Sequence, residues 1–300
     1  MSIAVIKGGG TLYERASTSF FKRVLPWFGI LPFVIFVGIF LIWPSVSVFR
    51  SALQSVDGAE KPAILEAISG QYLKSILFSV RLSAITALIG MIIGTLVALA
   101  IVSLDQMRGL RNWMVGYSAV AANLGGIPLA FAFIASLGMQ GLYTKILSVF
   151  GINLSAMGFK ISDFSGIVLV YLYFQIPLMT LLMLPAIDGL KVTLREAAAN
   201  LGASQRQYWT NIGLPLLTPS LLGGFLLLFA NAFSAYATAF ALSSGGTRLV
   251  SVQIRFYLQG NTITGKSNLG YALAAWMIIV MTLAMSGYLL LRRVSEKWQR

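Results

Sequence analysis

Six apolar stretches of about 20 residues or more divide the sequence, and each is long enough to cross a bilayer as an α-helix. Inside lipid, backbone N–H and C=O groups must pair within their own segment, so such stretches are expected to be helical. The sequence therefore predicts an all-α integral membrane protein with six transmembrane helices. The expected spans are Phe28–Phe49, Ile76–Val102, Trp113–Leu137, Gly166–Ala186, Pro219–Leu242 and Leu269–Leu291.

The segments outside these spans differ in charge. Most of the 22 lysines and arginines fall in the N-terminal segment 1–27, in the loops after the second and fourth spans, and in the tail 292–300. Six spans place all four of these segments on one side of the membrane. The positive-inside rule then predicts that both termini are cytoplasmic and that the loop 243–268 is external. The expected location of the membrane domain 28–291 is the bacterial cytoplasmic (inner) membrane.

The composition argues against chemistry in this chain. It contains no histidine, no cysteine and only nine aspartates and glutamates. The commonest general base and a cysteine-based metal site are therefore excluded. We expect no catalytic residue, no metal ligand and no enzyme activity. The formal net charge of +13 would suggest nucleic acid binding in a soluble protein. Between apolar spans it is better explained by orientation in lipid, so no nucleic-acid partner is expected.

The loop 191–218, between the fourth and fifth spans, carries the strongest local signals. Thr193 with Glu196, and Ser204 with Gln207, have the spacing of capping boxes that open helices. Gly202 between them fits the left-handed position that ends a helix. These signals predict two short helices outside the membrane.

The rest of this loop suggests how the unit ends and what it could contact. Pro215 and Pro219 are expected to end it and to start the fifth span, because proline is tolerated near a helix start. Tyr208 and Trp209 are side chains of the kind enriched at protein interfaces. Taken alone, the capping signals fit a plain amphipathic loop as well as they fit a docking element.

The spacing within this loop resembles the EAA loop of permease subunits from binding-protein-dependent ATP-binding-cassette (ABC) importers. The matching positions are Glu196, Ala197, Ala198, Gly202, Ile212, Leu214 and Pro215. The resemblance implies that Gly202 and its neighbours, including Ala203, form the coupling helix that docks on an ATPase subunit. Among subfamilies, the chain looks most like the spermidine/putrescine type.

This resemblance implies a set of partners. They are an ATP-binding-cassette ATPase dimer, a second permease subunit that is a sister chain or a copy of this one, and an extracytoplasmic solute-binding protein. ATP and Mg²⁺ would be held by the ATPase, and this chain would bind no cofactor. The implied substrate is a polyamine, with phosphonate, iron, thiamine or another small solute as alternatives.

A second motif is rejected. Gly260–Ser267 fits the P-loop formula G-x-x-x-x-G-K-[ST]. A P-loop works only between a buried strand and a helix whose N-terminus faces phosphate. Here the match lies in the expected external loop and precedes the sixth span. We therefore expect no nucleotide site in this chain.

Polar residues within the apolar spans are the candidates for the substrate pathway, because polar groups in a membrane need partners or water. The run Gly125–Pro128 could also break the third span and expose backbone to a cavity. The alternative for each side chain is an ordinary hydrogen bond between helices. The candidates are Asn123, Tyr171, Gln175, Asn231, Ser234, Tyr236 and Thr238.

Two features of the second span have simpler explanations. Gly90 and Gly94 form a small-xxx-small pair of the kind that lets helices approach closely. Arg81 lies near the outer end of the span. Its side chain either has a functional role within the membrane or extends to the membrane–water interface.

Two other classes of function were considered. A secondary transporter or channel usually couples to ions through acidic or histidine side chains within the membrane, and none is evident here. An intramembrane enzyme would lack catalytic parts.

Overall fold

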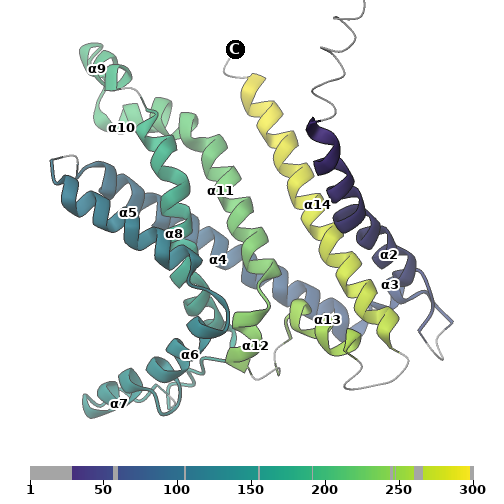
Figure 1. Ribbon diagram of the computed structural model, residues 1–300. Coiled ribbons are helices and arrows are strands. Elements are labelled where there is room, and N and C mark those ends of the chain that lie inside the picture. Colours follow the sequence, from purple (N-terminus) through teal and green to yellow (C-terminus); the bar gives the residue numbers. More distant parts are fainter. Residues whose placement is uncertain are drawn as a thin grey trace, which may run out of the picture. The chain divides into compact units, whose positions relative to one another are not determined.

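The computed structural model describes residues 29–56, 60–104, 106–154, 156–190, 192–243, 246, 248–259 and 266–297. The basic N-terminal segment and Gly260–Gly265 of the P-loop match lie outside these residues. Within them the chain forms helices and no named strand (Figure 1). The elements are η1 Gly38–Ile42, α2 Trp43–Ala52, α3 Ala63–Glu66, α4 Gly70–Val102, α5 Arg108–Asn123, α6 Gly126–Leu137, α7 Leu142–Val149, α8 Phe164–Asp188, α9 Val192–Asn200, α10 Gln205–Tyr208, η2 Trp209–Gly213, α11 Leu214–Ser234, α12 Ala237–Ser243, α13 Val250–Leu258 and α14 Ser267–Lys297.

The chain divides into two compact units, Met1–Ser51 and Ala52–Arg300. In the first unit the described residues are helical from Gly29 onward and include the π-helical turn η1. Their large apolar side chains are exposed, as expected of a helix whose surroundings are lipid. The second unit contains the remaining helices of the described residues, from α3 to α14, and is described below.

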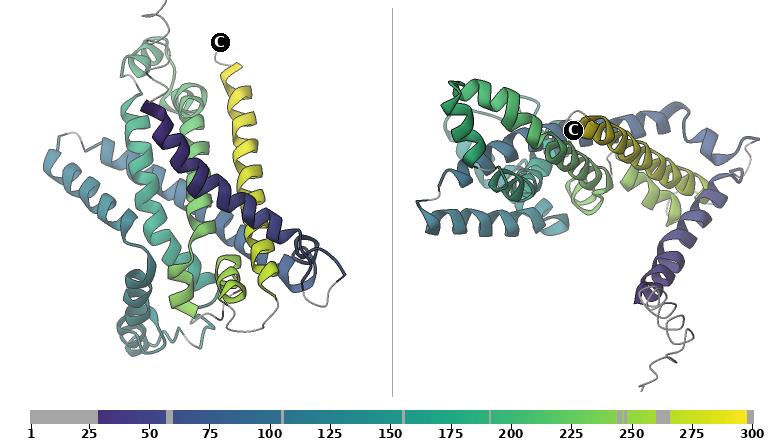
Figure 2. Two further views of the ribbon diagram at one scale, coloured as in Figure 1. Left: turned by 45° about the vertical axis from the view of Figure 1, so that its right-hand side comes forward. Right: turned by 90° about the horizontal axis from the view of Figure 1, so that it is seen from above.

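Six helices of the described residues are long and apolar enough to cross a membrane, which confirms the expected number. They are Gly29–Ala52, Gly70–Val102, Gly126–Val149, Phe164–Asp188, Gln205–Ser234 and Ser267–Leu290. The third differs from the prediction, which placed it at Trp113–Leu137. The expected span is broken, because α5 ends at Asn123 and α6 begins at Gly126 (Figure 2, left).

The centre of the second unit is the pair α4 and α8, against which α11 packs. Gly94 allows this pair to approach closely. A Cβ atom placed on it would lie 2.6 Å from Met179 Cβ and 2.7 Å from the carbonyl oxygen of Ile176. The Thr180 hydroxyl donates a hydrogen bond across the same seam to the Gly94 carbonyl, at 3.2 Å. Gly90 lies one turn earlier and faces Leu228 and Gln175. The interpretation of these glycines as a packing motif is confirmed.

The fifth span also begins differently from the prediction. Gln205–Ser234 is one continuous helix, in which α10 passes through η2 into α11. Pro215 and Pro219 therefore lie within the helix and do not start it. The wide π turn lies directly before Pro215, which has no backbone N–H to donate to the preceding turn. A break occurs instead at the far end, where Ala235 is extended and α12 follows.

The second unit has two distinct ends. Figure 1 shows α9, α10 and the C-terminal end of α14 at one end, with α12 and α13 at the other. Residues 192–218 and the C-terminal end of α14 therefore lie at the same end of this unit, as the expected topology requires. The side of the membrane that this end faces is a prediction from charge.

Candidate functional sites

The first candidate site is the elbow between α9 and α10. Gly202 has φ +81°, the left-handed conformation expected from the sequence. Its N–H donates to Ala199 O and the Ala203 N–H donates to Ala198 O, each at 2.9 Å. This pair of bonds is a Schellman motif, which satisfies the free carbonyl groups at the end of α9. The elbow is therefore fixed by its own backbone.

One of the two expected capping boxes is present. Ser204 Oγ accepts from the Gln207 N–H at 3.3 Å, and Gln207 Oε1 accepts from the Ser204 N–H at 2.8 Å. The other is absent, because α9 already begins at Val192 and Thr193 is thus inside the helix. Among the described residues, no hydrogen bond joins Thr193 to Glu196.

The exposed groups at the elbow differ from those expected. Tyr208 is buried and packs edge to face against Trp209, so it stabilises the elbow from within. Leu201, beside Gly202, is instead 89% exposed. A hollow of about 200 Å³ lies next to it, lined by Arg195, Ala198, Ala199, Ala203, Gln205 and Tyr208. Leu201 was missed in the sequence, since an isolated leucine at the end of a short polar helix carries no signal of exposure.

The remaining positions of the EAA pattern lie along the same segment. Glu196 and Ala197 are exposed on α9, and Ala198 faces the hollow. Ile212 lies in the π turn, and Leu214 and Pro215 begin α11 with exposed side chains.

The second candidate site is a cavity of about 300 Å³ between two broken helices. One break separates α5 from α6, and the other separates α11 from α12. The Gly126 N–H at the first break donates to Thr238 Oγ1 at the second, at 2.9 Å. The cavity is lined by Ala122, Asn123, Gly125, Gly126, Phe174, Asn231, Ala235, Tyr236, Ala237 and Thr238.

Four of the seven predicted pathway residues line this cavity, namely Asn123, Asn231, Tyr236 and Thr238. The other three do not. Tyr171 is fully buried and its hydroxyl donates to Ala235 O at 3.1 Å, which supports the break between α11 and α12. Gln175 is fully buried and its Nε2 donates to Thr86 Oγ1 at 3.1 Å. The Ser234 hydroxyl donates to Ala230 O in its own helix.

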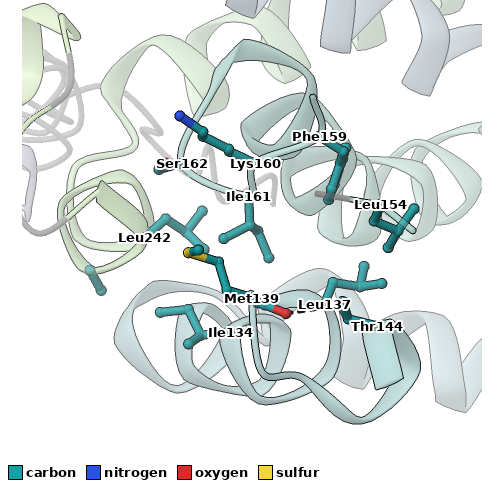
Figure 3. Close-up of a pocket in the computed structure, with 12 residues that line it drawn as sticks. Ile134, Leu137, Met139, Thr144, Leu154, Phe159, Lys160, Ile161, Ser162 and Leu242 are labelled. Carbon is teal, nitrogen blue, oxygen red and sulfur yellow. Dashed lines mark hydrogen bonds between the residues drawn. The ribbon is translucent and has the colours of Figure 1, made fainter. Parts of the chain in front are cut away.

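A third cavity, of about 340 Å³, lies between α6, α7 and the segment before α8 (Figure 3). Its wall is mostly aliphatic, with Ile134, Met139 and Ile161 directed inward in Figure 3. None of the predicted pathway residues lines it.

Solved structures have a fold similar to that of this chain. A bacterial alginate ABC transporter, in complex with an alginate pentasaccharide-bound periplasmic protein, contains a chain that superposes with a TM-score of 0.70. The match covers 92% of this chain and 97% of that one, at 20% identity. The chain has the fold of an ABC importer permease. The six apolar helices and this fold also make it a multi-pass protein of the bacterial inner membrane, as the sequence predicted.

Relatives by sequence are distant permeases with different named substrates. The ferric transport system permease protein FbpB of Actinobacillus pleuropneumoniae is 21% identical over 260 residues, which cover 84% of this chain and 36% of that one. The molybdenum transport system permease protein ModB of Mycobacterium tuberculosis is 26% identical over 218 residues, which cover 71% of this chain and 77% of that one. No protein-family model matches the chain. The match to FbpB thus spans little more than a third of that protein.

If solute passes through this cavity, changes to its polar wall should lower transport. Replacing Asn231 by alanine together with Tyr236 by phenylalanine removes two polar groups from its wall, each able to make a hydrogen bond worth about 1 kcal/mol. We expect uptake into proteoliposomes to fall about tenfold or more, with assembly intact. The solute to measure is the one carried by any binding protein that co-purifies with the chain.

Ser234→Ala is the matched control, because Ser234 lies one turn from Asn231 on α11 and its hydroxyl bonds its own backbone. It should transport like the parent. Full transport by the double variant would move the pathway away from this cavity.

Proposed function

We propose that this chain is the permease subunit of an ABC importer, forms half of the pathway for a small solute, and couples to a separate ATPase through the elbow at Gly202. The observation that carries the proposal is the elbow itself. It is capped by a Schellman motif on one side and a capping box on the other, and it presents an exposed leucine at its turn. A rigid exposed turn of this kind suits docking in a groove, because little conformational entropy is lost on binding.

The partners follow from this role. An ATP-binding-cassette dimer would dock at the elbow and hold ATP and Mg²⁺. A second permease subunit, either a sister chain or a copy of this one, would complete the pathway. An extracytoplasmic binding protein would deliver the solute at the opposite end, near α12 and α13. The similar alginate transporter is itself in complex with a periplasmic protein, which supports the last of these proposals. Both termini and the elbow would then be cytoplasmic.

The substrate is a small solute. The relatives described above are named for ferric iron and for molybdenum, and neither is named for a polyamine. The spermidine/putrescine type suggested by the sequence therefore stays a prediction.

Co-purification tests the proposal. The tagged 300-residue chain, extracted from membranes in mild detergent, should retain an ATPase, and this complex should hydrolyse ATP. Lys266→Ala is a control, since the P-loop match should play no part, and its complex should hydrolyse ATP at the parent rate. A chain that purifies without an ATPase and transports its solute along an ion gradient would instead be a secondary transporter. Loss of hydrolysis in the assembled Lys266→Ala complex would show that the P-loop match is used.

A further inference from the structure

Within the part of the chain that the structure describes, Arg255 on α13 is the charged side chain that contacts a polar residue of the cavity wall. Its guanidinium carbon lies 5.3 Å from the centre of the Tyr236 ring and 4.7 Å from the centre of the Phe240 ring. Arg255 Nη1 donates a hydrogen bond to the Tyr236 hydroxyl, and Nε donates to Gln259 Oε1 at 2.7 Å. The guanidinium is therefore held in place directly behind the wall of the cavity.

This positive charge has no acidic partner among the described residues. The salt bridge recorded there joins Arg111 to Asp188, near the other ends of α5 and α8. The described residues that line the cavity include no aspartate and no glutamate. Aromatic rings stabilise a cation through their faces without neutralising its charge. The charged side chain beside Tyr236 is therefore a cation with no recorded acidic counterpart among the described residues.

The polar groups of the wall point to the same ligand chemistry. The Tyr236 hydroxyl accepts from Arg255, so its own hydrogen is free to be donated, and the guanidinium polarises it. Asn231 adds an amide donor on the same wall. Donors and positive charge without a carboxylate suit an anion and disfavour a cation.

We propose that this pathway selects a solute with an anionic oxygen group, and that Arg255, acting through the Tyr236 hydroxyl, is the positioning residue that sets this preference. The inference rests on the proposed function, because it names the substrate class of the same pathway. A tetrahedral oxyanion and a sugar acid share the required chemistry. A polyamine is disfavoured, since its amines would face a positive wall.

The absence of native cysteine allows a test that needs neither the ATPase nor the binding protein. Ala237→Cys places one thiol on the cavity wall of the 300-residue chain in membranes. Its labelling rates are measured with 2-sulfonatoethyl methanethiosulfonate, which is anionic, and with the cationic 2-trimethylammonioethyl reagent. The ratio of these rates, divided by the ratio for free cysteine, reports the local potential.

We expect a ratio above one for Ala237→Cys alone, and a fall of about tenfold when Arg255→Gln is added, as removal of one nearby charge predicts at an intermediate dielectric. Arg255→Lys keeps the charge and should keep most of the ratio. Arg81→Gln is the matched control, because Arg81 lies over the ring of Phe164, which does not line the cavity. It should leave the ratio unchanged. An unchanged ratio in Arg255→Gln, or a cationic preference in the Ala237→Cys chain, would overturn the proposal.

Two further arms complete the test. An uncharged methanethiosulfonate must reach the thiol in every variant, and failure to do so would overturn the open cavity on which the proposal depends. Millimolar sulfate, glucuronate and putrescine are then compared as protectants. Protection by sulfate indicates a tetrahedral oxyanion, and protection by glucuronate indicates a sugar acid. Protection by putrescine, or by neither anion, contradicts the inference. If no ATPase co-purifies with the chain, the proposed function is refuted, but the labelling results remain valid because they do not depend on the ATPase.

Discussion

Replacing Gly94 by valine should prevent most of the protein molecules from reaching the folded state. The new side chain would meet a Met179 carbon and a backbone oxygen of α8 at distances well below van der Waals contact. A backbone atom cannot move aside as a flexible side chain can, so α4 and α8 would have to separate. Overpacking alone costs about 1–3 kcal/mol, and loss of the Thr180 bond adds about 1 kcal/mol. Together these are a large part of the total stability of a typical domain.

The measurement is the amount of monodisperse chain recovered from membranes, together with its melting temperature in detergent. Gly116→Val is the matched control, because Gly116 is also inside a helix and a Cβ atom there would meet nothing within 4 Å. It should be recovered at nearly the parent level. Equal recovery of Gly94→Val would mean that the α4–α8 seam is looser than described.

Replacing Gly202 by aspartate should leave the chain folded and abolish its coupling to the ATPase. The Cβ atom at this position meets nothing within 4 Å, so the substitution causes no clash inside the chain. The left-handed backbone costs about 1–3 kcal/mol for a residue other than glycine. An unpaired carboxylate buried in the docking groove costs more. At about 1.4 kcal/mol per decade, docking should weaken tenfold or far more.

Gly202→Asn separates the charge from the backbone effect. Asparagine and aspartate have nearly the same shape and are both tolerated in the left-handed region better than other side chains. The asparagine variant should therefore retain the ATPase within a few-fold of the parent, whereas the aspartate variant should lose it. Both should reach the membrane at parent levels. Parent-like transport by Gly202→Asp would show that the elbow is not the coupling element.

Local signals in the sequence predicted local structure well. The number of spans follows from hydropathy, which requires no knowledge of neighbours. The conformation of Gly202 and the Ser204 capping box follow from residue types at fixed spacing. The break at Gly125 was expected because two glycines and a proline fall together. Each of these features is determined by a few consecutive residues, so it can be recognised from the sequence alone.

Features that depend on packing could not be predicted in the same way. Helix α8 is apolar around most of its circumference, so its pattern does not indicate which side faces the core. Tyr171 and Gln175 were thus included with Asn231 among the pathway candidates, yet both are fully buried. Arg255 appeared to be one more charge of the loop 243–268, because its contact with Tyr236 joins α13 to the break between α11 and α12. The sequence cannot place these two segments side by side. The start of the fifth span was misplaced, since a π turn carries the helix from Gln205 through to Pro215 without interruption.

The continuity of Gln205–Ser234 has a mechanical consequence. This helix of 30 residues begins three positions after Gly202 and ends at the break that borders the cavity. At 1.5 Å per residue it is a rod about 45 Å long with one end at each proposed site. A tilt of about 5° at the elbow would carry the other end about 4 Å sideways. That displacement exceeds the width of a water molecule, so a small rotation at the ATPase would suffice to open or close the passage.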